Sequence, residues 1–375
     1  MTATGAPARR TPPGTLRHVL THLITPLLMC AGMGLAYLGA FHQPEPHGLR
    51  VDVVGQGRAA QALARTVEDG AGGALDVRTV ATRREAVDAL EHREVAGAYL
   101  PAAGGGTPEL LVATAASGTT TSVVEAAFTE VAAHRGSPLE VTDVTEPAEG
   151  DPTGQGLFFL LVALSIGSYA SVAVIGGAGA ALPLRTRAAL GLGTALAVSV
   201  IGTLLAGPVF GLVEHGLGGV WALAWAYSAG ILWLGTGLHT FLGRWTTLAM
   251  TTLFVMLNFT SSGGIFEPAL QPGFFGALHA FWNGAGFVEG ARGLVHFGGL
   301  HVGRSVLTLA LWAVAGLLML GIAHLAEERR RRAGAGAADA GAAGVGSRAA
   351  AAHHRASLHD DPEVEEEAEE EAVGV

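Results

Sequence analysis

Lysine is absent from this chain of 375 residues, whose basic side chains are all arginine. The phosphate-binding loop GxxxxGK[ST] needs its lysine, so the chain contains no such loop in standard form. Cysteine is almost absent, because Cys30 is the only one, and this excludes internal disulfides and zinc sites built from several cysteines. Lipid attachment to Cys30 would need small residues before it. Met29 fits that pattern poorly, which favours a buried packing thiol.

Acidic residues are scarce over one long region. Between Gln155 and Leu325 the only ones are Glu214, Glu267 and Glu289, although the whole chain has 32. Half of all residues are hydrophobic and only 14% are charged, which is typical of an integral membrane protein and not of a soluble enzyme. Membrane lipid is therefore an expected partner. No nucleic-acid partner is expected.

No arrangement typical of an active site occurs in the sequence. The zinc-hydrolase pattern H-E-x-x-H is missing. Glu214 and His215 are adjacent, but they lie in a loop and are more typical of a membrane boundary than of a catalytic pair. His353 and His354 lie in a polar tail, where a solvated pair is more common than a metal site. We therefore predict that the chain is not an enzyme and holds no catalytic residues, metal or cofactor.

The N-terminal region predicts an uncleaved transmembrane helix. Residues 1–18 are polar and carry arginines, and an apolar run follows at 19–41. A cleaved signal peptide would need a small residue three before the cut, where Leu38 stands, and the run is long for such a peptide. The arginines place residues 1–18 in the cytoplasm, because basic residues favour the cytoplasmic side.

Residues 44–152 have the composition of a soluble domain, which is extracytoplasmic if the first helix crosses outward. Alternating and helical hydrophobic patterns predict a compact α/β domain. Thr82 and Glu85 form a capping box that predicts the start of a helix. Strands are expected at Val51–Val54, Leu75–Val80, Val95–Leu100, Leu110–Thr114 and Leu139–Val144, and helices at Ala59–Val67, Thr82–His92 and Thr119–His134.

Gly55 and Gly57 follow the first predicted strand and precede a helix, which is the context of a dinucleotide-binding turn. No acidic residue closes the second strand, where Thr79 to Thr82 stand. A tight turn between strand and helix is therefore the preferred interpretation.

Residues 156–325 predict a five-helix membrane domain. Short loops with arginines at 185, 187 and 244, and the cluster Arg329–Arg332 after the last span, all fall on one side of the membrane. The five spans are expected at Gly156–Leu182, Ala188–Val213, Val220–Leu242, Trp245–Phe259 and Ser305–Leu325.

The fold class is therefore an α-helical integral membrane protein with six transmembrane helices (1+5) and an inserted extracytoplasmic α/β domain. Both termini are expected in the cytoplasm and the chain in the cell membrane as a multi-pass protein. Residues 333–375 are rich in Ala and Gly and then acidic, which predicts a disordered cytoplasmic tail.

One segment, residues 258–297, breaks the rule of plain membrane spans. Gly263, Gly264, Pro268 and Pro272 disfavour a continuous helix there. Non-helical backbone at membrane depth is tolerated only where protein or water covers it, so we expect a re-entrant or interfacial elbow. Its second limb, at 274–297, is predicted to be an outer-leaflet helix with one apolar and one polar face.

The elbow supplies the candidate functional residues, and two interpretations fit its charged members. Glu267 lines an exit path or contacts the soluble domain; alternatively, the charged residues lie at headgroup level, where an exposed i, i+3 pair contributes only a few tenths of a kcal/mol, roughly. The candidates are Ser261, Ser262, Gly263, Gly264, Phe266, Glu267, Pro268, Pro272, Glu289 and Arg292.

The elbow also carries a resemblance to a known family. The pattern Asn258-x-x-Ser261-Ser262-Gly263-Gly264-x-Phe266-x-Pro268, followed by Leu270-x-Pro272-x-Phe274-Phe275, resembles the type-2 ABC-transporter permeases. The branch that includes the phage-infection proteins is the most similar. The resemblance covers nearly the whole chain except the tail. Relatives usually have a proline where Trp282 and Asn283 stand here.

The resemblance implies the permease subunit of an exporter of an unidentified substrate, acting as a homodimer. ATP would be bound by a separate cytoplasmic ATPase subunit, and the elbow would lie at the outer exit. The alternative is a non-transporting envelope-assembly or receptor protein that acts through its extracytoplasmic domain.

Overall fold

The computed structural model describes residues 13–42, 44–102, 106–145 and 147–359. It divides into two compact units, Met1–Leu320 and Gly321–Val375. The first unit contains a mixed α/β domain and a bundle of apolar helices.

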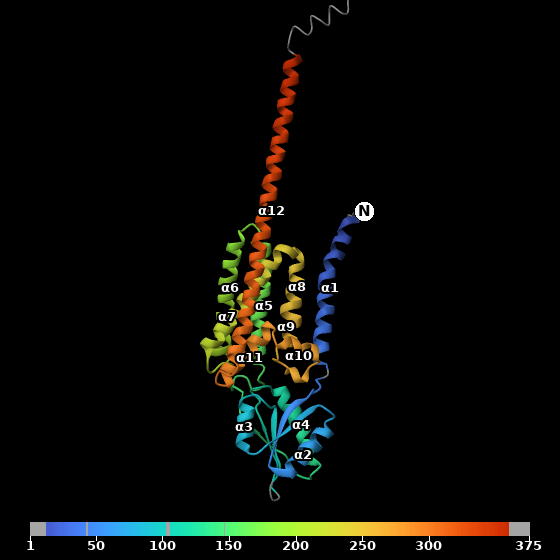
Figure 1. The fold of residues 1–375 in the computed structure, drawn as a ribbon, viewed down its shortest axis with the longest axis vertical. Coiled ribbons are helices and arrows are strands. Elements are labelled where there is room, and N and C mark those ends of the chain that lie inside the picture. The colour runs from blue at the N-terminus through green and yellow to red at the C-terminus, as the bar shows by residue number, and fades with distance from the viewer. Residues whose placement is uncertain (1–12, 43, 103–105, 146, 360–375) are drawn as a thin grey trace, which may run out of the picture. The chain divides into compact units, whose positions relative to one another are not determined.

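A five-stranded sheet with the order β2-β1-β3-β4-β5 forms the centre of the α/β domain (Figure 1). β1 pairs in parallel with β2 and β3, β3 pairs antiparallel with β4, and β4 pairs in parallel with β5. The strands are β1 (Leu49–Val54), β2 (Leu75–Val80), β3 (Gly97–Leu100), β4 (Glu109–Val112) and β5 (Glu140–Asp143), all within the segments predicted to be strands or within two residues of them.

Helices cover both faces of the sheet. α2 (Gly57–Gly70) and α4 (Gly118–Ala133) share one core with the buried side chains of β1, and α3 (Arg83–Glu91) packs on the opposite face. This placement follows from right-handed crossovers, because the chain leaves β1 in one direction and β2 in the other. The predicted capping box is present, since the Thr82 hydroxyl accepts a hydrogen bond from the Glu85 amide at 3.2 Å.

The turn at Gly55 and Gly57 depends on glycine for its backbone. The two residues have φ angles of 155° and 77°, where other residues are strained. The predicted tight turn therefore accounts for both glycines.

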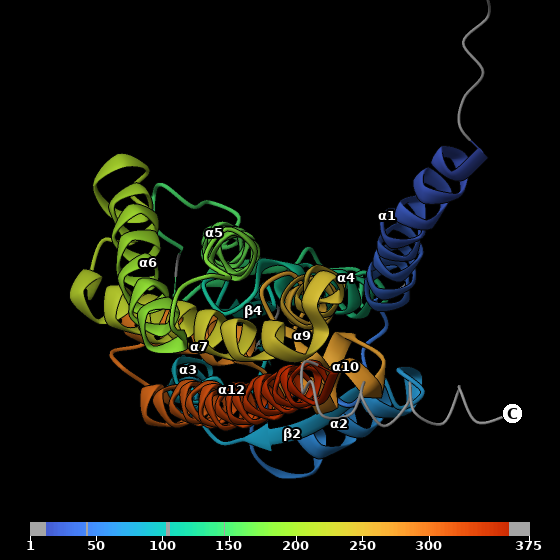
Figure 2. The same ribbon diagram turned by 90° about the horizontal axis from the view of Figure 1, so that it is seen from above.

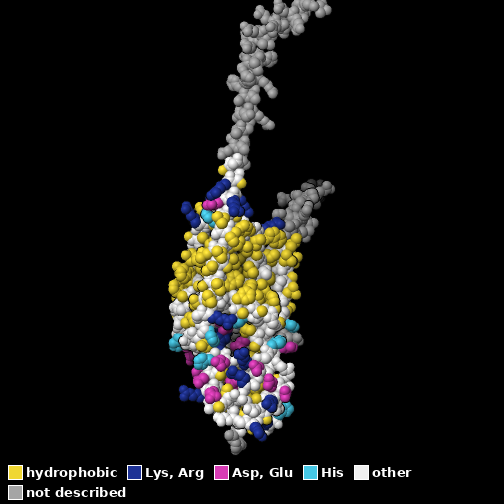
Figure 3. Space-filling model, viewed as in Figure 1, with side chains coloured by type: hydrophobic (Ala, Val, Ile, Leu, Met, Phe, Trp, Pro, Cys, Tyr) yellow, Lys and Arg dark blue, Asp and Glu magenta, His cyan; other side chains and the backbone are white. Residues whose placement is uncertain are grey.

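Within the described residues, five helical stretches are long and apolar enough to cross a membrane. Figure 3 shows their apolar side chains as a continuous band that is nearly free of charged side chains, many of which lie over the α/β domain. The chain is thus a membrane-embedded protein by length and composition. The stretches are Leu23–Phe41, Gly156–Gly177, Leu184–Val209, Leu217–Ser261 and Val302–Gly336.

The bundle is built around a buried apolar core to which α5, α6, α7, α11 and α12 contribute. α1 packs loosely at the edge of the bundle, on the opposite side from α6, as Figure 2 shows. The main helices are α1 (Pro13–Phe41), α5 (Gly156–Gly177), α6 (Leu184–Leu204) with a π-helical turn η1 (Leu205–Val209), α7 (Leu217–Leu242) and α12 (Val302–His359).

The stretch Leu217–Ser261 consists of two limbs. Gly243 ends α7 with φ 51° and ψ −118°, and the chain then runs back along α7. Contacts between the limbs join Gly235 to Met250 and Tyr227 to Asn258. The returning limb contains η2 (3-10 helix, Gly243–Trp245), α8 (Thr246–Thr251), η3 (π-helix, Thr252–Met256) and α9 (Leu257–Ser261).

The second limb of the elbow differs from its prediction. It forms two helices, and the longer one is buried instead of presenting a polar face to the surface. Gly284 and Gly290 explain the burial, because their missing side chains let α11 approach Asn258 and Ser305 closely. The elbow contains a 3-10 turn η4 (Pro268–Leu270), α10 (Gly273–His279) and α11 (Asn283–His296).

The C-terminal segment also differs from its prediction. α12 continues through Ala333 to His359, where the sequence predicts a disordered tail. Alanine has the highest helix propensity, and this segment is rich in it. The acidic residues of the predicted tail from position 360 lie outside the described residues.

Candidate functional site

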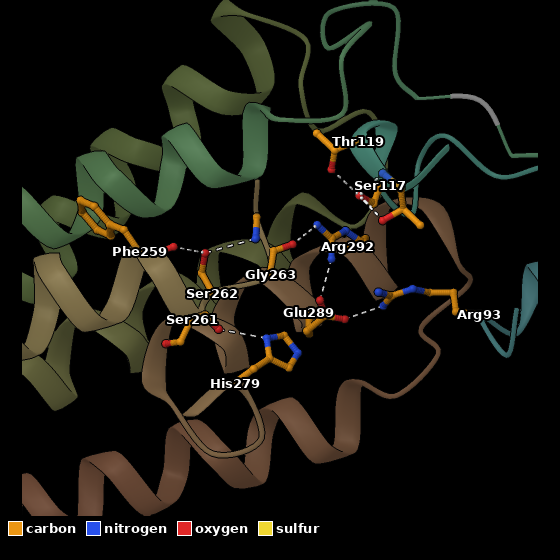
Figure 4. Close-up of polar contacts among 12 residues, drawn as sticks. Arg93, Ser117, Thr119, Phe259, Ser261, Ser262, Gly263, His279, Glu289 and Arg292 are labelled. Carbon is orange, nitrogen blue, oxygen red and sulfur yellow. Dashed lines mark hydrogen bonds and ion pairs between the residues drawn. The ribbon is translucent and has the colours of Figure 1, made fainter. Parts of the chain in front are cut away.

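The end of α9 is held by side chains that bond its free carbonyl groups (Figure 4). The last carbonyls of a helix have no partner within the helix, and lipid offers none. Side chains supply the partners here: Ser262 Oγ bonds Phe259 O (3.0 Å), Gln271 Nε2 bonds Thr260 O (2.7 Å), His279 Nδ1 bonds Ser261 O (3.0 Å) and Arg292 bonds Gly263 O (3.0 Å).

Gly263 and Gly264 form the break that follows α9, and two separate reasons require glycine there. Gly263 has φ 71°, and a Cβ there would also meet the His279 ring and the Glu289 carboxylate. A Cβ on Gly264 would meet the ring of Phe158 on α5. The break therefore needs both a left-handed residue and space for two neighbouring elements.

Asn258, the first residue of the predicted elbow, joins the break to the bundle. Its Oδ1 accepts a hydrogen bond from the Gly284 amide at 2.7 Å, near the start of α11, and its Nδ2 donates to Tyr227 Oη at 2.7 Å. Tyr227 in turn bonds Ser165 on α5 at 2.5 Å. The four groups are buried, so this network fixes α5, α7, α9 and α11 relative to one another.

A charged cluster joins the α/β domain to the elbow. Arg93 lies just after α3, and its guanidinium contacts Glu289 Oε2 at 2.5 Å although the two residues are 196 positions apart. Arg292 contacts the other oxygen, Oε1, at 2.6 Å (Figure 4). The side chains of Arg93, Glu289 and Arg292 are only 16%, 21% and 3% exposed. We call these three residues the ion triad.

The two guanidinium groups control the charge of Glu289. Burial alone would raise the pKa of its carboxyl group, but Arg93 and Arg292 outweigh burial and hold that pKa well below its usual range. Glu289 is therefore ionised at neutral pH. An exposed helical pair contributes little, but this carboxylate is paired on both oxygens and largely excluded from water.

Arg93 occupies a backbone position that usually takes glycine. It follows the helix cap of α3 with φ 56°, and its amide and that of Glu94 bond the carbonyls of Leu90 and Ala89 at 2.9 and 2.8 Å. A left-handed conformation costs a non-glycine residue about 1 kcal/mol. The ion pair, together with the stacking of the guanidinium 5.5 Å from the Phe297 ring, offsets that cost.

Three further contacts fasten the α/β side of the chain to the elbow. The His47 amide donates to Ala269 O at 2.8 Å. Thr119 donates from the first turn of α4 to Ile265 O at 2.6 Å. The rings of Phe41 and Phe266 lie 5.6 Å apart. The elbow therefore contacts the α/β domain at Ile265 and Ala269, and it contacts the end of α1 at Phe266.

A cavity of about 280 Å³ lies between the α/β domain and the elbow. Its polar wall comes from both sides, and it shares Arg93 and Glu289 with the ion triad. Glu267 also lines it, and its negative charge interacts at longer range with Arg93 and Arg292. The charged and hydroxyl-bearing lining residues are Arg50, Arg93, Glu94, Ser117, Thr120, Thr121, Glu267, His279 and Glu289.

Comparison with known protein families, curated proteins and solved structures gives no match. The resemblance to type-2 ABC-transporter permeases therefore stays a prediction. The candidate site rests on its geometry. Across the described residues, no group of three or more His, Cys, Asp or Glu side chains is placed to hold a metal ion.

The structure brings the predicted site residues together around the break. Ser261, Ser262 and Gly263 form its bonded end, Phe266 packs on α1, and Glu267 and Pro268 line the cavity. Pro272 precedes α10, and Glu289 and Arg292 belong to the ion triad.

Sequence reasoning missed the partners that come from other elements. Arg93, Gln271 and His279 are the most important, and Thr119 adds a fourth contact. One signal for Arg93 was available, because the predicted helix at 82–92 ends without a glycine.

Proposed function

We propose that the chain is the membrane subunit of an exporter in the cell membrane. It has six transmembrane helices and an extracytoplasmic α/β domain, works as a homodimer, and is driven by a separate cytoplasmic ATPase subunit. The elbow and the cavity beside it form the outer exit for the substrate.

The observation that carries this proposal is the ion triad beside the cavity. Arg93 reaches from the α/β domain to Glu289, and Arg292 passes the contact on to the backbone at Gly263. A domain that only displayed a binding surface would need no charged connection to a broken segment of the bundle. Such a connection favours a protein in which a conformational change in the elbow also moves the α/β domain.

The count of six spans and their orientation are supported by the two limbs of Leu217–Ser261. The chain turns back at Gly243, and we count the two limbs of this stretch as two crossings. Gly176 packs against His239, so the ends of α5 and α7 lie together. The arginines that follow these ends, Arg185 and Arg244, therefore share the side opposite the α/β domain, which is the pattern expected of a cytoplasmic face.

The test is to purify the full chain at native expression, look for a co-purifying nucleotide-binding subunit and measure ATP hydrolysis by the complex. We expect near-stoichiometric recovery of one ATPase. The Glu289→Gln variant should keep the subunit but change the hydrolysis rate by about threefold or more, because it breaks the coupling. Glu68→Gln, on the exposed side of α2, is the matched control and should leave the rate unchanged.

Two results would count against the proposal. One is repeated absence of an ATPase together with recovery of envelope proteins, which favours the assembly or receptor function. The other is an ATPase whose rate is the same in wild type and Glu289→Gln.

The second candidate function is supported by a groove on the α/β domain. It has a volume of about 380 Å³ and lies between α2 and α4, where Leu63, Val67 and Phe128 form its apolar lining. Those three side chains belong to the buried core of the domain, so the test uses exposed residues of the same groove, Glu130, His134 and Arg135. A partner-binding protein would lose function when these exposed residues are replaced by alanine. An exporter would lose function when Glu289 is replaced.

A further inference from the structure

A second cavity, of about 140 Å³, lies where α10, α11 and the start of α12 meet. His279 and Glu289 line both this cavity and the larger one beside the α/β domain, and Figure 4 shows these two side chains next to each other at the elbow. Arg93 and Arg292 already balance the charge of Glu289. The arginine in the lining of the second cavity is Arg304, which lies outside the ion triad.

Arg304 has an unusual position among the arginines of the membrane domain. Between residues 156 and 325 the chain has five arginines and no lysine, and three of the five fall on the side expected to be cytoplasmic. Basic residues are disfavoured in the outer loops of membrane proteins, so an arginine near the α/β domain needs a reason of its own. Arg292 has one in the ion triad, whereas Arg304 forms no salt bridge with any described residue.

Arg304 also stands at the edge of a long apolar run. No charged residue follows it until Glu327, and the 22 residues between them span about 33 Å of helix at 1.5 Å per residue. The hydrocarbon core of a bilayer is about 30 Å thick, so Arg304 lies at the depth where phospholipids carry their phosphate groups. Three side chains that follow it on α12 are between 49% and 60% exposed and face lipid: Val306, Leu307 and Leu311.

Most donors of the Arg304 guanidinium group are open. The one hydrogen bond that it forms with a described residue runs from Nη2 to Ala280 O at 3.4 Å, and a guanidinium group has five N–H donors. Ser305, which is only 4% exposed, and Thr308 line the same cavity, and neither hydroxyl is bonded to a described residue. An acceptor in the cavity would therefore meet a charged fork and two hydroxyl donors.

We propose that this cavity binds the phosphate group of an anionic phospholipid, whose acyl chains lie along the exposed apolar face of α12. Arginine suits phosphate because its planar fork can donate two parallel hydrogen bonds to phosphate oxygens. The volume of about 140 Å³ equals roughly five water molecules at about 30 Å³ each, so the phosphate enters and the rest of the lipid stays outside. A zwitterionic headgroup binds less well, because its own cation competes with Arg304 for the phosphate.

The test is native mass spectrometry of the full chain in detergent, titrated with phosphatidylglycerol, phosphatidylcholine or the soluble headgroup glycerol 3-phosphate. Phosphatidylglycerol should bind about tenfold more tightly than glycerol 3-phosphate, because only the lipid adds apolar contact along α12. It should also bind about threefold more tightly than phosphatidylcholine.

Variants of the cavity locate the phosphate. Arg304→Gln should weaken binding of phosphatidylglycerol by about tenfold, because hydrogen bonds between charged groups are lost. Thr308→Val keeps the shape of the side chain but removes a donor, and should weaken binding by about threefold. The matched control Arg65→Gln removes the same charge from an exposed position on α2 and should bind like the wild type.

A photoactivatable group in the acyl chain of phosphatidylglycerol tests the second half of the proposal. Labelling should fall on residues 306–311 of α12 and should drop about tenfold in Arg304→Gln. Labels confined to other helices, or labelling that Arg304→Gln leaves unchanged, would overturn the proposal.

The proposal is also overturned if Arg304→Gln and Arg65→Gln bind phosphatidylglycerol alike, or if phosphatidylcholine binds equally well. Equal binding of glycerol 3-phosphate would show that the ligand is a free phosphate compound and not a lipid. The site goes beyond the exporter function, because it requires only that the chain lies in a membrane. Neither measurement needs an ATPase, so the two proposals can fail separately.

Discussion

Two substitutions of Arg93 separate the energy of the ion triad from the strain of its backbone. Arg93→Ala removes the contact to Glu289 but keeps a side chain at φ 56°. Glu289 retains Arg292, so we expect a loss of about 2 kcal/mol, the value of one hydrogen bond between charged groups. Arg93→Gly loses the same contact and relieves about 1 kcal/mol of strain. The glycine variant should therefore be about 1 kcal/mol more stable than the alanine variant.

The assay is denaturant unfolding of the full chain in mild detergent, with hydrogen exchange at α3 and α11 to locate the change. Exchange around Glu289, in the middle of α11, should rise in both variants, because the domain no longer contacts this part of the helix. Arg65→Ala, an exposed arginine on α2, is the control and should change stability by less than about 0.5 kcal/mol. Equal stability of the glycine and alanine variants would refute the strain. Wild-type stability and exchange in both would refute the ion pair as a connection.

Three other substitutions test the site. The pKa of Glu289 lies below its ordinary value of 4.5, so the ionised carboxylate stabilises the fold fully above about pH 4.5, and this stabilisation is lost as the pH falls toward the lowered folded pKa. The difference in unfolding free energy between wild type and Glu289→Gln should therefore shrink on acidification. A constant difference would contradict the pairing. Gly263→Ala should cost about 2 kcal/mol or more in unfolding experiments, whereas Gly72→Ala, at φ 58° in open space, should cost only about 1 kcal/mol; equal costs would show that the approach of His279 does not matter. Asn258→Leu should cost about 2 kcal/mol in the same experiment, because the buried Gly284 amide loses its partner while the Tyr227 hydroxyl keeps only Ser165, and a neutral result would refute the network.

The α/β domain was largely predictable because its signals are local. Thr82 and Glu85 fix a helix start through bonds between neighbours, and the alternation at Leu75–Val80 gives β2 with the same bounds. The order of the strands was not part of the prediction. It depends on the crossover directions, which join residues far apart in the sequence.

The candidate site was only half predictable. Gly263 and Pro268 predict the break from sequence alone, because glycine and proline disfavour a helix through their own backbone chemistry. The groups that satisfy the break come from elements whose approach is tertiary, and Arg93 is 196 residues away from Glu289. The burial of α11 was mispredicted for the same reason. The glycines of α11 allow tight packing, but the sequence does not reveal that the packing partners are Asn258 and Ser305.

The bonded end of α9 has a mechanical consequence. Because side chains occupy its carbonyls, the break is a stiff joint, and bending it would leave several backbone groups without partners in an apolar layer. The contacts continue from the α/β domain through Arg93 and Glu289 to the joint, and Asn258 bonds Tyr227 inside the bundle. In the exporter that we propose, the α/β domain is the outer end of this chain of contacts, and Tyr227 is its inner end among the apolar helices.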